Sequence, residues 1–101
     1  SSVIAFKKLL EKNPVTIEME DYASMEKVGP LPTKLPQNNM HMNTAPGDII
    51  LYQGKYIVIY YDTNSYSLTP IAKMINIDQN GLKSVLGSGN IKATFSLADE
   101  I

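Results

Sequence analysis

The stretch PGDIILYQGKYIVIYYDTNSY, residues 46–66, decides the fold of this chain. Within it, residues 49–52 and 56–61 are rich in β-branched and aromatic side chains, and a three-residue link containing Gly54 separates them. This composition is typical of two strands joined as a β-hairpin. Because residues 57–61 do not alternate with polar residues, we expect the second strand to be covered on both faces and to form the centre of the core.

Upstream of the hairpin, the sequence predicts a helix, a strand and a loop. Apolar residues recur at helical spacing from Ser2, which is expected to cap the helix, up to Asn13, where a proline follows and ends it. Residues 15–20 then alternate between apolar and polar, as in a half-buried strand. Residues 21–47 contain four of the six prolines, so we expect a long, mostly ordered loop there, with a short extended piece near residues 25–28.

Downstream of the hairpin, residues 62–67 are polar and predict a loop, and residues 71–77 predict a strand. Residues 82–86 keep helical spacing and end at Gly87, and residues 91–97 alternate like a final strand. About six short strands with two short helices predict a single mainly β domain over the 101 residues. We expect a small β-barrel, because closing a sheet removes the edges that otherwise aggregate.

The composition excludes several classes of function. The chain has nine Lys, no Arg, and a formal net charge of -1, which argues against a nucleic-acid partner because such partners need a basic surface. Cysteine is absent, which excludes disulfides and thiolate chemistry without assigning a compartment. The apolar runs are far shorter than the roughly 20 residues of a transmembrane helix, so no membrane span is expected.

The order of these segments resembles the bacterial cyclophilin-like proteins. The similarity is carried by the segments SVIAFKKLLEKNPVTIEMED (2–21), EKVGPLPTKLP (26–36), PGDIILYQGKYIVIYYDTNSY (46–66) and GLKSVLGSGNIKATF (81–95). Its most specific parts are the two Leu-Pro pairs at 31–32 and 35–36, the Pro-Gly-Asp at 46–48 and the Leu-Gly-Ser-Gly at 86–89. The resemblance implies a small cyclophilin-like β-barrel with two short helices.

The resemblance also implies partners and an unusual edge. Members of that family are often encoded beside or fused to flavodoxin-like domains, so a flavodoxin-like protein is an expected partner. Members usually carry one or two further strands before the helix that here starts near Ser2, so we expect that an N-terminal strand or hairpin is lacking. A lacking strand leaves a neighbour's edge open, and a homodimer through that exposed edge is expected.

The activity that the resemblance suggests is peptidyl-prolyl isomerisation. True cyclophilins rely on an arginine beside aromatic and amide residues, and this sequence has neither Arg nor Trp. We therefore expect a non-catalytic module that binds a ligand or a protein and assign no catalytic residue. A weak prolyl isomerase or another small enzyme is the alternative.

Other chemical motifs in the chain are weak. Met40-His41-Met42 offers soft ligands for Cu(I), but without Cys or a second His it is an incomplete site. The carboxylates of residues 18, 20, 21 and 26 match no calcium loop, and the glycines at 87 and 89 follow a predicted helix instead of leading into one. We expect no metal and no cofactor.

The strongest binding signal is aromatic, because five tyrosines lie between residues 52 and 66. Neighbouring Tyr60 and Tyr61 point to opposite faces of a strand, so at least one of them can face a groove. Tyrosines at a groove suit a peptide or a small planar ligand, whereas the simpler interpretation is that they cap the core with their hydroxyls in water. The candidate ligand-binding residues are Tyr52, Tyr60, Tyr61, Tyr66, Met19 and His41.

Overall fold

Strands dominate the structure, a computed structural model that describes residues 1–23, 25–75 and 77–98. The mainly β class is therefore confirmed, with seven antiparallel strands and two helices in the described residues. In chain order these are α1 (Ser2–Lys12), β1 (Val15–Tyr22), β2 (Glu26–Pro30), β3 (Met40–Asn43), β4 (Asp48–Tyr52), β5 (Tyr56–Tyr60), β6 (Ser65–Lys73), α2 (Gln79–Leu86) and β7 (Ile91–Phe95).

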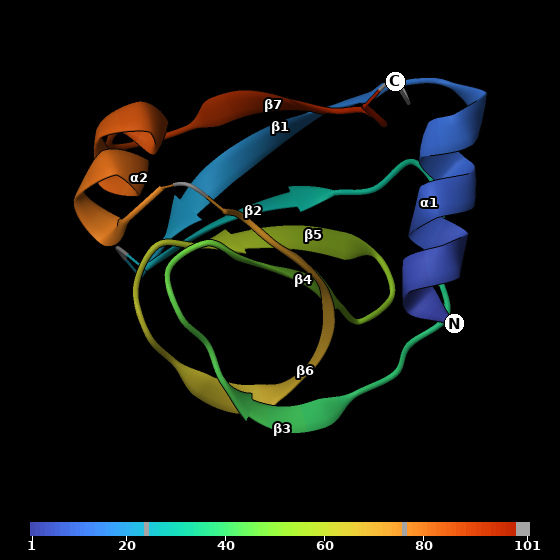
Figure 1. Cartoon of the computed structure of the whole chain (residues 1–101), viewed down its shortest axis with the longest axis horizontal. Helices are drawn as coiled ribbons and strands as arrows, with labels where there is room; N and C mark the ends of the chain where they lie inside the picture. Colours follow the sequence, from blue (N-terminus) through green and yellow to red (C-terminus); the bar gives the residue numbers. More distant parts are fainter. Residues whose placement is uncertain (24, 76, 99–101) are drawn as a thin grey trace.

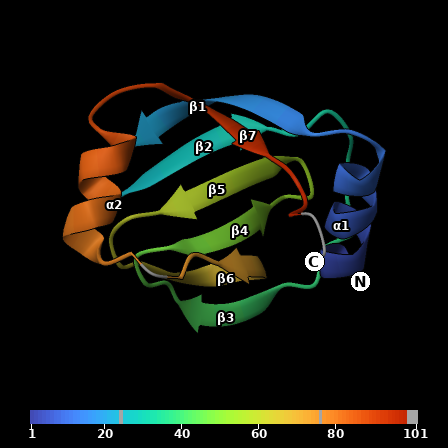
Figure 2. The same ribbon diagram turned by 45° about the horizontal axis from the view of Figure 1, so that its top comes forward.

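The strands form one curved sheet in the order β3-β6-β4-β5-β2-β1-β7 (Figure 1). Within the described residues, the edge strands β3 and β7 do not pair with each other. The expected barrel is therefore not closed, and the sheet keeps two edges. The two helices lie at opposite ends of the strands, α1 on one side of the view and α2 on the other (Figures 1 and 2). A homodimer through either edge stays a prediction, which light scattering across a concentration series tests.

The hairpin of β4 and β5 is confirmed and lies near the middle of the sheet. Its strands pair from Ile49 opposite Ile59 to Tyr52 opposite Tyr56. The turn between them needs positive φ at two successive residues, Gln53 at 55° and Gly54 at 71°, the signature of the tight turns that match strand twist. A side chain at Gly54 would also lie 2.7 Å from a backbone oxygen of the preceding loop, so glycine is required there twice over.

Two parts of the sheet differ from the sequence prediction. The loop predicted at 62–67 and the strand predicted at 71–77 have the wrong bounds, because β6 begins at Ser65 and ends at Lys73. Residue 76 of the predicted strand lies outside the described residues. Pro70 hides this strand in the sequence, and it is tolerated because it lies opposite Ile50 where the register with β4 shifts. The predicted loop 21–47 likewise contains β3, which pairs Met40 through Asn43 with the exposed start of β6.

Strand β1 divides its pairing between two neighbours. Its first five residues, 15–19, pair with β7, whereas Glu20 to Tyr22 pair with β2. Strands β1 and β2 lie very close together just beyond their last paired residues. A side chain at Gly29 of β2 would lie 2.5 Å from Ile17 Cγ2 and 2.6 Å from the Glu18 carbonyl oxygen. Only glycine permits this close approach.

The main core lies on one face of the sheet, under both helices. Helix α1 packs there through Phe6, whose ring meets Phe95 of β7 edge to face at 6.1 Å between centroids. Ser1, and not Ser2 as expected, caps this helix by accepting a hydrogen bond from the Ile4 amide at 3.3 Å. Ser2 is buried instead, and its amide and hydroxyl both donate to the Asn38 side-chain oxygen at 2.8 Å.

The other face of the sheet carries a smaller cluster that contains Ile50, Val58, Tyr60 and Leu68. Because neighbours in a strand point to opposite faces, β5 contributes Ile57 and Ile59 to the main core and Val58 and Tyr60 to this second cluster. The prediction that β5 is covered on both faces is thereby confirmed. Of the described helices, neither has the length and apolarity needed to cross a membrane.

Candidate tyrosine pocket

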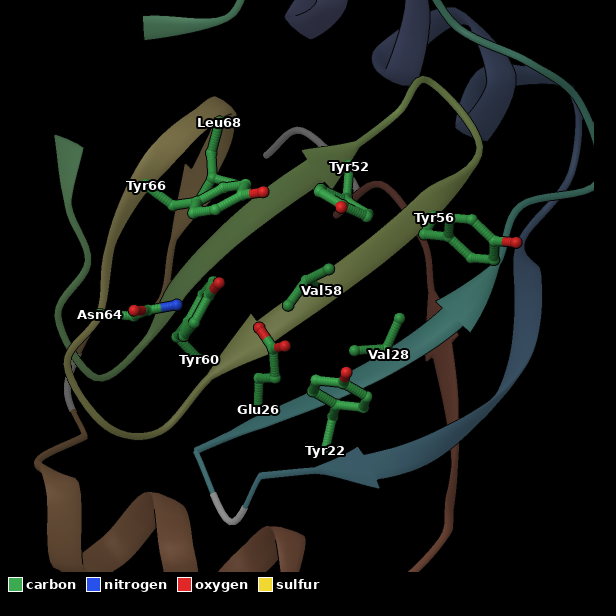
Figure 3. Close-up of a pocket in the computed structure, with 10 residues that line it drawn as sticks. All are labelled: Tyr22, Glu26, Val28, Tyr52, Tyr56, Val58, Tyr60, Asn64, Tyr66 and Leu68. Carbon is green, nitrogen blue, oxygen red and sulfur yellow. The ribbon is translucent and has the colours of Figure 1, made fainter. Parts of the chain in front are cut away.

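A cavity of about 450 Å³ opens on this second face and spans five neighbouring strands or their ends (Figure 3). We call it the tyrosine pocket, and its lining residues are Tyr22, Glu26, Val28, Tyr52, Tyr56, Val58, Tyr60, Asn64, Tyr66 and Leu68. Five of the six tyrosines of the chain therefore face one cavity. A volume of this size falls in the usual range for small-molecule sites, roughly 300–1,000 Å³.

The register of the sheet explains why these side chains meet. Residues directly opposite in antiparallel strands present their side chains on the same face. Tyr22 is opposite Glu26, which in turn is opposite Tyr60, so these three form one row across β1, β2 and β5. Tyr56 is opposite Tyr52 at the far end of the hairpin, and the curl of β6 brings Tyr66 over the cavity.

Three of the rings form a continuous aromatic wall. The Tyr52 centroid lies 6.4 Å from that of Tyr56 and 6.4 Å from that of Tyr66, with the rings tilted relative to one another. The charge and the hydrogen bond of neighbouring Tyr66, together with burial, raise the pKa of the Tyr52 hydroxyl. The Tyr52 hydroxyl therefore stays protonated and can donate a hydrogen bond at neutral pH.

Glu26 supplies the pocket with a carboxylate. Burial raises the pKa of this side chain, a hydrogen bond from Tyr60 opposes the rise, and the charge of Asp21 adds to it. Burial and the hydrogen bond to Glu26 raise the pKa of Tyr60 to about 12, while a hydrogen bond with Asn64 opposes the rise. Figure 3 shows Glu26 between the rings of Tyr60 and Tyr22, facing the cavity.

The structure brings together three of the six residues that the sequence analysis named for ligand binding. Tyr52, Tyr60 and Tyr66 line the tyrosine pocket. Tyr61 points to the opposite face and belongs to the main core, where 8 % of it is exposed. Met19 is fully buried in the same core, although it also borders a second depression beside the pocket.

The sixth candidate, His41, is exposed on the edge strand β3 and its Nε2 lies 3.1 Å from the Ser65 hydroxyl. Met40 and Met42 flank it in a strand, so both point to the face opposite His41. Met42 packs against the second cluster. The three side chains therefore do not converge on one point, and the His, Asp and Glu side chains described here form no group of three that suits a metal.

Tyr22 and Glu26 are two of the seven pocket residues that are not among the candidates named from the sequence. In the sequence, Glu26 is one of four carboxylates that match no calcium loop, and Tyr22 lies at the start of the loop predicted at 21–47. Their pairing with each other and with Tyr60 depends on β1 and β2 being consecutive antiparallel strands. An extended piece predicted at 25–28 beside a strand ending near residue 20 was the signal that could have found this hairpin.

Comparison with known proteins identifies the family. A model of the cyclophilin-like family matches residues 1–96, which is nearly the whole chain. No curated protein and no solved structure gave a significant match. This chain, with its open sheet, two helices and tyrosine pocket, therefore belongs to the cyclophilin-like family.

Proposed function

We propose that this domain is a non-catalytic ligand-binding module and that its tyrosine pocket holds a small organic molecule or a peptide side chain. The observation that carries the proposal is the gathering of five tyrosines around one cavity of about 450 Å³. Tyrosine is used for binding because it presents a large rigid apolar ring and a polar hydroxyl at little cost in conformational entropy.

The pocket walls favour a ligand with a flat or compact apolar part. Val28, Val58 and Leu68 line the cavity between the rings, so an apolar group placed there leaves water and contacts carbon on several sides. Glu26 and Asn64 add a few polar groups at one end, which fix the orientation of a ligand. This combination of apolar walls with few polar groups is typical of small-molecule sites.

A ligand screen followed by NMR tests this proposal. Planar aromatic compounds and proline-containing peptides are titrated into the labelled domain, and binders are expected to shift the amide signals around Tyr52 and Tyr66 selectively. Tyr66 is more than half exposed, so Tyr66→Ala is expected to keep the fold and to weaken a binder several-fold. Ile75→Ala, which removes an even more exposed side chain outside the pocket, is the control. Failure of these compounds, and of every other small organic ligand tried, to shift these signals overturns the proposal.

A second candidate function is proton transfer by Glu26. The specific observation in its favour is the raised pKa of this carboxyl group beside a tyrosine in a cavity, a combination that also occurs at general acids. Turnover of a ligand found by the screen, abolished by Glu26→Gln without loss of binding, supports this candidate. Unchanged ligand after prolonged incubation supports the binding module.

A further inference from the structure

The charge of the tyrosine pocket is one-sided. Glu26 is the one carboxylate among the residues described as lining the cavity, and those residues include no Lys or His. The chain as a whole has no Arg that could complete an ion pair there. A ligand in the pocket therefore meets a carboxylate that no neighbouring cation of the lining neutralises.

The aromatic wall adds to this preference. The face of a tyrosine ring is electrostatically negative and attracts a cation placed within about 6 Å of its centroid. Because the centroids of Tyr52 and Tyr56, and of Tyr52 and Tyr66, are 6.4 Å apart, one cation can lie within about 6 Å of two of them at once. The chain already contains one such contact in its core, where the Lys27 ammonium lies 5.6 Å from the centroid of Tyr61.

The region next to the pocket is acidic as well. A second depression, of about 710 Å³, shares Tyr22, Val28 and Tyr56 with the tyrosine pocket and is bordered by Glu18 and Glu20. Lys92 also borders it and lies 4.0 Å from Glu18, so the charges of this pair offset each other and Glu20 accounts for the net negative charge of the residues described as lining it. A ligand that extends from one cavity into the other stays in a field that favours positive charge.

We propose, building on the binding function above, that the tyrosine pocket selects an organic cation, a quaternary or alkylated ammonium group seated among the rings and facing Glu26. A bare metal ion does not fit, because Ca²⁺ and Mg²⁺ need about six oxygen ligands and the cavity wall is mostly carbon with a single carboxylate. An alkylated ammonium matches both features, since its methyl groups contact the rings and its charge is balanced by Glu26.

The test compares choline with its uncharged isostere 3,3-dimethylbutan-1-ol, which has the same shape without the charge. Each is titrated into the labelled domain and followed by the amide signals of the pocket strands. Choline is expected to bind at least about tenfold more tightly than the isostere, because only the charged compound is attracted by the negative faces of the rings and by the Glu26 carboxylate. Equal binding of the two compounds overturns the proposal.

Two variant pairs locate the charge and the rings. Glu26→Gln is expected to weaken the binding of choline about tenfold and to leave the binding of the isostere unaffected. Glu11→Gln makes the same charge change at an exposed position of α1 and is the control. Tyr66→Leu, which removes the ring, is expected to weaken choline more than Tyr66→Phe, which keeps it. Similar losses for Glu26→Gln and Glu11→Gln count against the proposal.

The outcomes separate this inference from the function on which it rests. If neutral aromatic compounds shift the pocket signals and choline does not, the binding module stands and the proposed preference for a cation is overturned. Binding of choline alone, sensitive to Glu26→Gln, supports both. Failure of every cation and every neutral compound to shift the pocket signals overturns both.

Discussion

The ammonium of Lys27 lies 3.0 Å from a carboxylate oxygen of Asp21, and the Lys27 side chain is 0 % exposed. The same ammonium donates a hydrogen bond of 2.6 Å to the carbonyl oxygen of Gly89, and the Tyr61 hydroxyl donates to the same Asp21 oxygen. A buried ammonium is costly unless it is paired and hydrogen-bonded, and here both conditions are met. This network joins β1 and β2 to the segment between α2 and β7, so it is structural and lies on the face opposite the pocket.

Lys27→Met is expected to lower the free energy of unfolding by about 2–4 kcal/mol, because it leaves a partly buried carboxylate without its cation. Urea unfolding followed by circular dichroism measures the loss. Lys73→Met is the matched control, since Lys73 is largely exposed and its ion pair with Asp48, at 3.7 Å, is worth at most about 1 kcal/mol. Equal losses in the two variants contradict a structural role for the buried pair.

Alkaline pH is expected to destabilise the domain through its buried tyrosines. Burial, followed by the hydrogen bond to Asp21, raises the pKa of Tyr61 to about 12 from an ordinary value of 10.0. A raised pKa contributes stability that is complete below about pH 10 and is lost as the pH rises through about 12. Unfolding free energies measured at intervals from about pH 9 to 12 are expected to fall. Tyr61→Phe is expected to fall less steeply, and an unchanged slope in that variant contradicts the assignment.

Glu26→Gln is expected to raise the melting temperature at neutral pH. Burial raises the pKa of Glu26, so the folded state favours the protonated carboxyl. The stability gained from this preference is present below the ordinary value of 4.5 and is lost as the pH rises through the folded pKa. Gln imitates the protonated form, so its advantage appears at neutral pH and disappears in acid. Calorimetry at both pH values checks this, and a lower melting temperature at neutral pH contradicts it.

Gly29→Ala is expected to cost several kcal/mol, roughly 2–4, because the added methyl would lie 2.6 Å from the Glu18 carbonyl oxygen and force the two strands apart. Gly89→Ala is the control, where the backbone has a φ of 81° but no atom lies within 4 Å of an added methyl. That variant should lose only about 1 kcal/mol from backbone strain. Chemical denaturation compares them, and a Gly29→Ala loss no larger than the control contradicts the close approach.

The sequence predicted the elements whose local pattern agrees with their position in the fold. The helix at the start of the chain and the last strand were found because their apolar residues keep one period throughout. The central hairpin was found because two runs of β-branched and aromatic residues flank a short link that contains Gly54. Strand β6 was misplaced because half of it is exposed and Pro70 interrupts it, so its identity comes from pairing with β3 and β4. The prediction of a closed barrel was wrong for a similar reason, since no local sequence pattern indicates whether β3 pairs with β7.

The pocket was predictable only in part. The alternation of β5 correctly separated Tyr60 from Tyr61, but choosing which face holds the cavity requires the curvature of the sheet. The sequence pattern therefore points to Tyr61 and not to Tyr22, which lies 38 positions before Tyr60 and meets it only through Glu26 of β2. Such non-local neighbours are set by strand register, which short sequence windows do not contain.

The rings that surround the pocket belong to segments spread from Tyr22 to Tyr66. A molecule bound between the side chains of Tyr22 and Tyr66 would cross-link β1 and β6, because these strands otherwise connect only through the strands between them. The ligand-bound domain should then resist proteolysis better than the ligand-free domain, since the bound ligand opposes the local unfolding that proteases require.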